Sequence, residues 1–283
     1  MSESILENMS KYLTFNTHSL EESDMAKKQK IFADTVSEIL PDVIALQEVN
    51  QTQSAPQITD IPKRFTSLKE GTVFTADNHA LAITKLLEEN GTPYYWTWAP
   101  FKVGYGKYDE GLALYSRKPI LEVREIPISK TRDYSNYRTR SLLGIKTEDG
   151  WFYAVHVSWW GDVEEPFAQQ WKVIKAQTAD ESNVTLMGDF NGDADTRNET
   201  YDLVKNDGWY DSFQLADQHD EGWTILGNID GWDGQEVVPT RRIDQIWFDQ
   251  KRPVATSEVI FNGKNRPIIS DHFGVLVETK EES

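Results

Sequence analysis

The chain has 283 residues, 39% of them hydrophobic, a formal net charge of −17 and no cysteine. This is the composition of a globular protein that can bury a core. The lack of cysteine excludes disulfides, thiolate metal sites and a cysteine nucleophile. Because a surface this acidic repels a polyanion, and no dense basic strip offsets it, long nucleic acid is disfavoured as a partner and small substrates are favoured.

No run of residues approaches the roughly 18 apolar positions that a membrane span needs. The first residues, MSESILENMSKYLTF, also lack the basic and apolar regions of a secretion signal. We therefore expect no membrane association and, by default, a cytoplasmic location. No linker or repeat interrupts the chain, so one domain over residues 1–283 is expected; the oligomeric state is left open.

The chain opens with a predicted strand, helix and strand. Residues 11–16 alternate in polarity as a strand does, and residues 24–40 carry an apolar helical face that Asp24 caps and Pro41 ends. Residues 42–48 read as a buried strand that finishes in Gln47 and Glu48. A polar loop over 51–75 follows, and then a helix from Asp77 to about residue 90.

The middle of the chain is rich in strands. Closely spaced strand candidates at 94–100, 111–117, 120–128, 141–146 and 151–158 imply antiparallel neighbours. A helix over 167–180, a strand over 184–187 and a short helix over 198–206 come next. Residues 207–240 show little periodicity, and long loops of this kind are usually functional. Strands at 242–248, 254–261 and 270–278 close what reads as an α/β fold.

The segment TLMGDFNGDAD, residues 185–195, ends one of these strands in polar residues. Because side chains alternate along a strand, Asp189 and Asn191 should point the same way while Phe190 returns to the core. The alternative is a plain turn, since Asp, Asn and Gly are turn residues.

Similar polar residues end several other strands, which favours a site over a turn. They are Asn16, Glu48, Asp189, Asn191, Asp244, Asp271 and His272. Two unit charges about 4 Å apart interact by about 4 kcal/mol even at a dielectric of about 20, so converging carboxylates must be neutralised. Protonation or arginine would do this, but an oxygen-rich cluster suits a hard cation such as Mg²⁺ or Mn²⁺.

Seven motifs in sequence order resemble the endonuclease/exonuclease/phosphatase superfamily, which has the deoxyribonuclease-I-like fold. They are FNTHS, DVIALQE, YDEGLALYS, AVHVS, LMGDFN, RIDQIWF and SDHFGV. The resemblance implies a four-layered α/β/β/α sandwich of two mixed sheets with a metal site at one end. It also implies a metal-dependent phosphate-ester hydrolase.

The resemblance also implies roles for the acidic residues and amides. Glu48 becomes the chief metal ligand with Asn16 beside it, and Asp271 a ligand that could serve a second ion. Asp189 would orient or deprotonate the attacking water, and Asn191 would hold a phosphate oxygen.

Two histidine pairs are implied as well. His272 would contact the phosphoryl group with its tautomer held by Asp271. Glu110 and His156 would form the second pair near the leaving oxygen, and Asp244 would orient its neighbours.

Each of these assignments has an alternative. His156 could be a buried core histidine, Glu48 a surface carboxylate, and Asp244 a partner of Arg241 or Arg242. The other histidines, His18, His79 and His219, are expected to have no catalytic part, although His18 is close enough to Asn16 to leave substrate contact open.

A phosphate also needs a cation from the protein, and Arg138 and Arg140 are the candidates, with Arg140 favoured over Arg138. The alternative for both is a solvated surface charge. Ten tryptophans offer flat faces for a sugar ring or for core packing. The first candidates for a sugar are Trp159 and Trp160, followed by Trp209, Trp223 and Trp232.

The expected substrate is a small phosphorylated sugar, hydrolysed at a phosphomonoester. NTHS, ALQEVNQ and HVSWW with EPFAQQW resemble the bacterial maltose 6′-phosphate phosphatase group of the superfamily. The first alternative is a metal-dependent nuclease or other phosphodiesterase, and the second is a binding module without catalysis.

Overall fold

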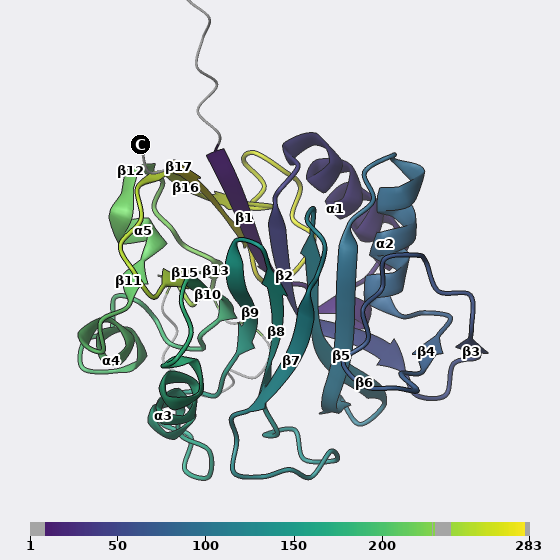
Figure 1. Cartoon of the computed structure of the whole chain (residues 1–283), viewed down its shortest axis with the longest axis horizontal. Coiled ribbons are helices and arrows are strands. Elements are labelled where there is room, and N and C mark those ends of the chain that lie inside the picture. Colours follow the sequence, from purple (N-terminus) through teal and green to yellow (C-terminus); the bar gives the residue numbers. More distant parts are fainter. Residues whose placement is uncertain (1–8, 228, 230–238, 281–283) are drawn as a thin grey trace, which may run out of the picture.

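The computed structural model describes residues 9–227, 229 and 239–280. Two β-sheets pack face to face, and helices cover their outer faces (Figure 1). The strand order is β12-β16-β17-β1-β2-β6-β5 in one sheet and β11-β15-β10-β9-β8-β7 in the other, and both sheets are mixed. The predicted four-layered α/β/β/α sandwich is confirmed.

The strands of the seven-stranded sheet are β1 (Met9–Asn16), β2 (Val43–Thr52), β5 (Tyr95–Gly104), β6 (Tyr108–Ser116), β12 (Ala216–His219), β16 (Val254–Ile260) and β17 (Gly274–Lys280). Those of the six-stranded sheet are β7 (Glu122–Pro127), β8 (Ser141–Thr147), β9 (Gly150–His156), β10 (Val184–Asp189), β11 (Tyr210–Asp211) and β15 (Asp244–Phe248). The helices are α1 (Met25–Ile39), α2 (His79–Glu89), α3 (Phe167–Thr178), α4 (Thr200–Asn206) and α5 (Ser212–Leu215), with a 3-10 turn at Ser19–Glu21. No described helix is both long and apolar enough to cross a bilayer.

Three apolar clusters fill the spaces between the four layers of helices and sheets. One cluster joins α1 and α2 to the seven-stranded sheet, and another joins α3 and α4 to the six-stranded sheet. The third fills the space between the sheets, with Tyr12, Leu114, Phe152 and Phe248 among its members. Along β9, Trp151 and Tyr153 face the helices while Phe152 and Ala154 face the other sheet, as a period of two requires.

The same alternation points the predicted site residues into the space between the sheets. His156 continues the inner row of Phe152 and Ala154, and Asp244 begins the inner row of β15. Asn16, Glu110 and Asp189 occupy equivalent places on β1, β6 and β10. The polar ends of the strands therefore meet where the inter-sheet core stops.

Strand β2 differs from its prediction at Glu48. The strand continues to Thr52, and its register with β6 shifts between Leu46 and Val49. Both of these residues face the helices although they are three apart, so one extra residue is accommodated between them. Glu48 lies in this β-bulge with a φ of 54°, which turns its side chain away from the regular alternation.

Helix α2 begins two residues later than predicted. The side chain of Asn78 accepts a hydrogen bond from the backbone N–H of Leu81 at 2.9 Å, so Asn78 and not Asp77 caps the helix. The carboxylate of Asp77 instead accepts from the Thr52 N–H and the Thr75 hydroxyl.

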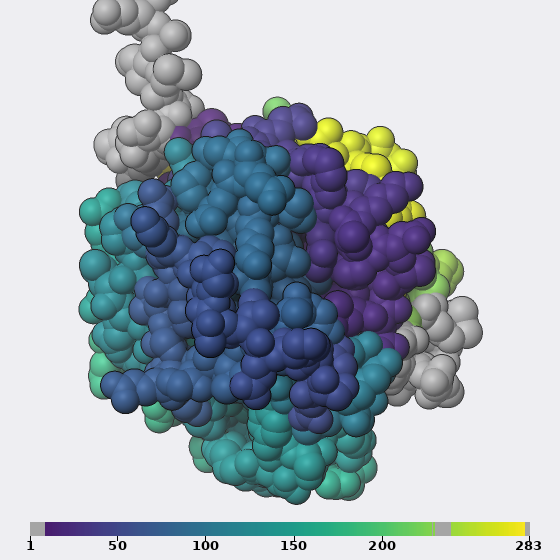
Figure 2. Space-filling model, turned by 90° about the vertical axis from the view of Figure 1, so that its right-hand side faces the viewer, coloured from purple at the N-terminus to yellow at the C-terminus, as the bar shows by residue number. Residues whose placement is uncertain are grey.

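The two stretches predicted as loops contain short strands. Residues 51–75 include the end of β2, β3 (Gln57–Ile58) and β4 (Phe74–Thr75), and residues 207–240 include β11, α5, β12, β13 (Ile225–Leu226) and the start of β14 (Thr240–Arg241). Elements of two to four residues are too short to show a period. Figure 2 shows the face on which α1, α2 and the segment after β2 cover the larger sheet.

We predict that His79→Gln weakens the acid sensitivity of the fold. His79 is buried at the start of α2, and burial lowers its pKa to about 3. A depressed pKa means that the unfolded chain binds the proton first, so stability is lost as the pH falls below 6.5. Between pH 7 and pH 5 the free energy of unfolding should fall by about 2 kcal/mol less in the variant.

Urea denaturation at both pH values measures this difference. His219→Gln is the control, because His219 is exposed. An equal pH dependence in His79→Gln and the wild type would contradict the prediction.

Candidate active site

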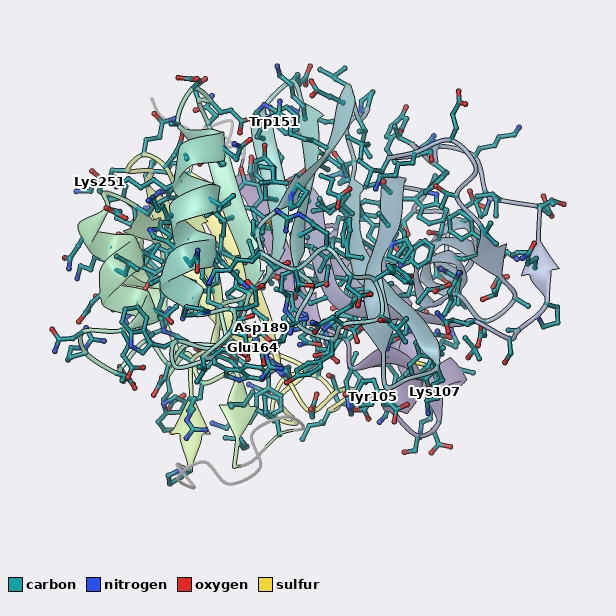
Figure 3. The ribbon with its side chains drawn as sticks, turned by 90° about the horizontal axis from the view of Figure 1, so that it is seen from below. Tyr105, Lys107, Trp151, Glu164, Asp189 and Lys251 are labelled. Atoms are coloured by element: carbon teal, nitrogen blue, oxygen red, sulfur yellow. The ribbon has the colours of Figure 1, made fainter. Side chains whose placement is uncertain are left out.

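A pocket of about 1080 Å³ opens at one end of the space between the sheets. Figure 3 views that end of the molecule, with Asp189 near its centre and Tyr105 on the β5–β6 hairpin to one side. The residues that line the pocket include Glu48, Lys102, Tyr105, Glu110, Arg138, Arg140, His156, Asp189, Asn191 and His272. Asn16, Asp244 and Asp271 do not line it and lie behind these residues or beside them.

Strand register brings three of the predicted residues side by side. Asp189 is the partner of His156 in the parallel pair of β10 and β9, and of Asp244 in the antiparallel pair of β10 and β15. Because neighbouring strands are about 4.8 Å apart, these side chains form one row across three strands. The convergence predicted from the separate strand ends is confirmed.

Glu48 and Asp189, which come from different sheets, meet at one amide. The Asn16 Nδ2 donates to Glu48 Oε1 at 2.9 Å and to Asp189 Oδ2 at 3.2 Å. The alternative of a surface carboxylate for Glu48 is therefore wrong. The side-chain Oδ1 of Asn16 accepts from the His18 N–H at 3.2 Å, so the amide nitrogen and not the oxygen faces the two carboxylates, and the ligand role of Asn16 stays a prediction.

Buried like charges perturb both carboxyl groups. Burial, then Glu110 and Asp271, raise the pKa of Glu48. Burial, then Asp244, raise the pKa of Asp189 to about 7. In the absence of a cation, the site therefore holds its charges at a cost in free energy.

The partner of His272 is Asp244 and not Asp271. The His272 Nδ1 lies 2.9 Å from Asp244 Oδ2, whereas Asp271 precedes His272 and its side chain points elsewhere. Although burial opposes the charged imidazole, Asp244 and Asp189 raise the pKa of His272 to about 10. Asp244 thus orients His272 and keeps it protonated. Among the described residues Asp244 forms no ion pair with Arg241 or Arg242, and Arg242 instead binds Asp211 at 2.7 Å.

The predicted pair of Glu110 and His156 is replaced by an ion pair. Glu110 Oε1 lies 2.9 Å from the Nζ of Lys102, which is its cross-strand partner on β5. No hydrogen bond or ion pair joins Glu110 to His156 in the described part of the chain. An added Cβ at Gly104 would collide with the Glu110 carboxylate, so only glycine lets β5 approach it so closely.

His156 lies within reach of both central carboxylates. Its Nε2 is 3.8 Å from Asp189 Oδ2 and 4.0 Å from Glu48 Oε1. Burial, then the charges of Arg140 and Lys102, lower its pKa well below the ordinary value. His156 is therefore neutral at pH 7, and it lines the pocket instead of being enclosed in the core.

The segment after β10 has the predicted orientation. Phe190 is fully buried against Trp247, while Asp189 and Asn191 line the pocket. Asn191 has a φ of 45° and its N–H donates to Asp189 Oδ1 at 2.8 Å. Its amide donates to the Val157 carbonyl at 2.8 Å, which fixes the direction of the side chain.

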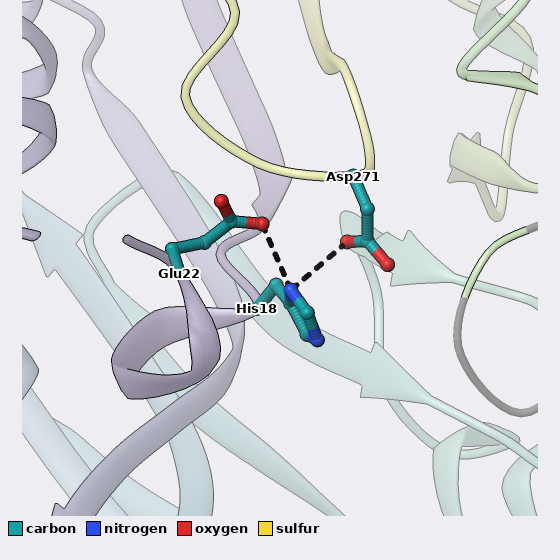
Figure 4. Close-up of side chains that lie close together, drawn as sticks. All are labelled: His18, Glu22 and Asp271. Atoms are coloured by element: carbon teal, nitrogen blue, oxygen red, sulfur yellow. Dashed lines mark hydrogen bonds and ion pairs between the residues drawn. The ribbon is translucent and has the colours of Figure 1, made fainter. Parts of the chain in front are cut away.

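Asp271 lies in a second cluster beside the first (Figure 4). The His18 Nδ1 is 2.8 Å from Glu22 Oε1 and 3.8 Å from Asp271 Oδ1. Burial opposes the charge on His18, but Glu22 and Asp271 raise its pKa to about 9. The histidine expected to have no catalytic part thus neutralises a predicted metal ligand.

The two candidate phosphate-binding arginines differ in their partners. Arg138 Nε is 3.0 Å from Asp162 Oδ2, so its charge is already paired. Arg140 is only 6% exposed and lines the pocket, and the alternative of a solvated surface charge is wrong for it. This difference supports the preference for Arg140 over Arg138.

The tryptophans divide between pocket and core. Trp159 and Trp160 both line the pocket, while Trp159 also packs on Ile225, Ile229 and Ile243. Trp209 is buried against Trp171, so it belongs to the core. Trp223 is exposed, and Trp232 lies outside the described residues.

The sequence interpretation missed Lys102, Tyr105 and Tyr137 in the pocket lining. Lys102 could have been found by counting along the hairpin. Gly104 pairs with Tyr108, so the register places Lys102 opposite Glu110. The tyrosines carried no such signal.

The donor set fits a divalent cation. It consists mainly of carboxylate oxygens, as hard cations prefer. The ligand atoms of Asp189, Asp244 and His272 lie within 4.8 Å of one another, as do those of His18, Glu22 and Asp271. Among the described residues, Asp244 Oδ1 is buried and has no hydrogen-bond partner, as expected of an atom that a cation or a water would satisfy.

The layered sandwich, with acidic and imidazole side chains at one end of the inter-sheet space, defines a deoxyribonuclease-I-like protein. A sequence profile described as the Endonuclease/Exonuclease/phosphatase family matches residues 13–272. The chain belongs to this family, whose members are hydrolases that act on phosphate esters. A comparison with curated protein sequences finds no match.

Solved structures agree with this assignment. An endonuclease/exonuclease/phosphatase family protein from Leptotrichia buccalis is 31% identical with a TM-score of 0.84, covering 96% of this chain and 100% of that one. A mannosyl-6-phosphatase from Bacteroides thetaiotaomicron is 18% identical with a TM-score of 0.61, over 96% and 100% of the two chains. A 3′ phosphatase from Neisseria, bound to a product DNA hairpin, is 16% identical with a TM-score of 0.64 and the same coverage.

We predict that Asp189→Asn stabilises the metal-free protein at pH 8. A pKa raised to about 7 means that the wild type loses stability as the pH rises through 7. The isosteric amide removes this charge, so the free energy of unfolding should rise by roughly 1 to 4 kcal/mol at pH 8 and by less at pH 5.

Thermal and urea denaturation in EDTA measure the effect. Asp180→Asn is the control, because Asp180 is exposed. If the variant is no more stable than the wild type at pH 8, the charge on Asp189 does not lower the free energy of unfolding.

Proposed function

We propose that the chain is a divalent-metal-dependent phosphatase that hydrolyses a phosphomonoester of a small phosphorylated sugar. The observation that supports this most is the pocket itself, where a carboxylate cluster, a buried arginine and two tryptophans line one cavity. The net charge of −17 opposes a polyanionic substrate. Maltose 6′-phosphate is the sugar phosphate that the sequence resemblance favours.

In this proposal Asp189 acts on the attacking water. Its carboxylate lines the pocket between His156 and His272, where it can accept a proton from water as a general base does. The water oxygen bonds to phosphorus as the bond from phosphorus to the sugar oxygen breaks. The leaving oxygen takes up a proton, and the products are the free sugar and inorganic phosphate.

Three groups would hold the phosphoryl oxygens. His272, kept protonated by Asp244, donates from Nε2, which lies 4.0 Å from Asp189 Oδ2. Arg140 contributes a buried guanidinium, and Asn191 the second N–H of its fixed amide. His156 would contact the leaving oxygen. Glu110 would hold Lys102 through their ion pair and would not act on the imidazole of His156.

Glu48 and Asp271 would hold the divalent ion, with Asn16 as a third ligand if its side chain turns. Bound there, Mg²⁺ or Mn²⁺ neutralises the carboxylates and supplies Lewis-acid stabilisation of a phosphoryl oxygen. The raised pKa of Glu48, caused by burial and then by Glu110 and Asp271, supports a cation in this place.

Trp159 and Trp160 would contact the sugar. Both are half-buried at the pocket, and a flat indole face suits the apolar side of a sugar ring. The Bacteroides relative is named for a sugar phosphate, which supports the class of substrate.

The second candidate is a nuclease or other phosphodiesterase. The Neisseria relative, a 3′ phosphatase bound to a product DNA hairpin, favours a nucleic-acid substrate. The two candidates differ in salt dependence, since binding to a duplex should weaken steeply as salt rises.

A panel of sugar phosphates, with maltose 6′-phosphate included, tests the proposal in the presence of Mg²⁺ or Mn²⁺. We expect inorganic phosphate from at least one of them and no salt-dependent retention of duplex DNA. Nicking of plasmid DNA without phosphate release from any sugar phosphate would replace the proposal with the second candidate.

We predict that Glu48→Ala and Asp189→Ala each abolish turnover while the fold survives. In the proposal Asp189 acts on the attacking water and Glu48 holds the divalent ion, and neither belongs to an apolar core cluster. Rates and circular dichroism measure the two parts of this prediction. Near wild-type rates in either variant would refute the assigned roles.

A further inference from the structure

We infer that Lys102 and Arg140 form a two-cation subsite that takes the doubly charged phosphate of a monoester in preference to a diester. This inference rests on the proposed function, because it concerns which phosphate ester the same pocket accepts. The inference assigns a binding role to Lys102, which is not among the site residues predicted from the sequence.

Both cations are built into the pocket wall. Lys102 is 8% exposed and Arg140 is 6% exposed, and both line the pocket that holds Asp189 and His156. A single carbonyl oxygen, that of Tyr137, accepts from Lys102 Nζ at 3.1 Å and from Arg140 Nη1 at 2.9 Å. Two positive charges are thus held close together with little solvent around them.

Lys102 and Arg140 are only partly paired with negatively charged groups. Glu110 is the only carboxylate that the described residues place in an ion pair with Lys102, and none forms an ion pair with Arg140 there. The Nε of Arg140 is buried and has no hydrogen-bond partner among the described residues. Burial and the neighbouring Arg140 lower the pKa of Lys102, while Glu110 and Glu48 oppose this shift. An anion bound at this wall would satisfy both groups.

The charge of the ester decides which anion suits the wall. A phosphomonoester has a second pKa near 6 and carries close to two negative charges at neutral pH, whereas a diester carries one. A second cation therefore stabilises the monoester more than the diester. The hydrogen bonds of Lys102 to Glu110 and Tyr137 use two of its three donors, so one remains for a ligand.

The competing explanation is that Lys102 only neutralises Glu110. In that case its loss would disturb the site equally for every ester. A role in binding predicts unequal losses, together with weaker affinity for free phosphate.

The first experiment compares Lys102→Met and Lys102→Arg with the wild type on p-nitrophenyl phosphate and bis(p-nitrophenyl) phosphate at saturating Mg²⁺. The ratio of kcat/KM for monoester over diester should fall at least tenfold in Lys102→Met, mainly through KM for the monoester, and recover largely in Lys102→Arg. Lys107→Met is the control and should change nothing, since Lys107 pairs with Glu21 on the surface outside the pocket.

The second experiment measures binding of inorganic phosphate by calorimetry, which needs no turnover. Glu110→Gln keeps the ammonium and should bind phosphate at least as tightly as the wild type, while Lys102→Met/Glu110→Gln should bind it at least tenfold more weakly. This pair of variants also covers the case in which Lys102→Met alone fails to fold.

Equal losses on both esters, or phosphate binding that is unchanged when Lys102 is removed, would overturn the subsite. If the wild type hydrolyses no monoester at all, the proposed function fails. The phosphate titrations still decide the subsite in that case.

Discussion

Repulsion between buried carboxylates is the constraint around which this molecule is arranged. Glu48, Asp189, Asp244 and Asp271 come from four separate segments, and strand register forces three of these segments to one end of the inter-sheet space. Burial, followed by the neighbouring carboxylates, raises the pKa of Glu48 and of Asp189, so the fold alone does not offset the cost of these charges. A structure that holds like charges together against their repulsion is prepared for a cation.

The neighbouring residues partly balance these charges, each in a separate pair. His272 pairs with Asp244, His18 with Asp271 through a longer contact, and Lys102 with Glu110. Asn16 donates to Glu48 and Asp189 together. Each pair fixes a side chain in one orientation before any ligand arrives, and this preorganisation lowers the reorganisation that catalysis would otherwise require. The pairs also explain why the protein tolerates so much buried charge.

The four-layered fold and the roles of His156 and Asp244 were predicted from the resemblance of the sequence motifs to a family, and the shared direction of Asp189 and Asn191 from alternation along a single strand. Partners could not be predicted in this way, since a partner depends on which strands are adjacent and in what register. For this reason the sequence paired His272 with Asp271 and His156 with Glu110, whereas the structure pairs them otherwise. The bulge at Glu48 and the short elements after Asp207 escaped prediction for a different reason, because neither shows a period.

The direction of the Glu48 side chain depends on the single extra residue in the β2 bulge. With regular alternation, residue 48 would join Leu46 on the side of α1 and α2, and a carboxylate there would be buried in hydrocarbon. The extra residue in the bulge therefore decides whether this carboxylate faces the pocket or the helices.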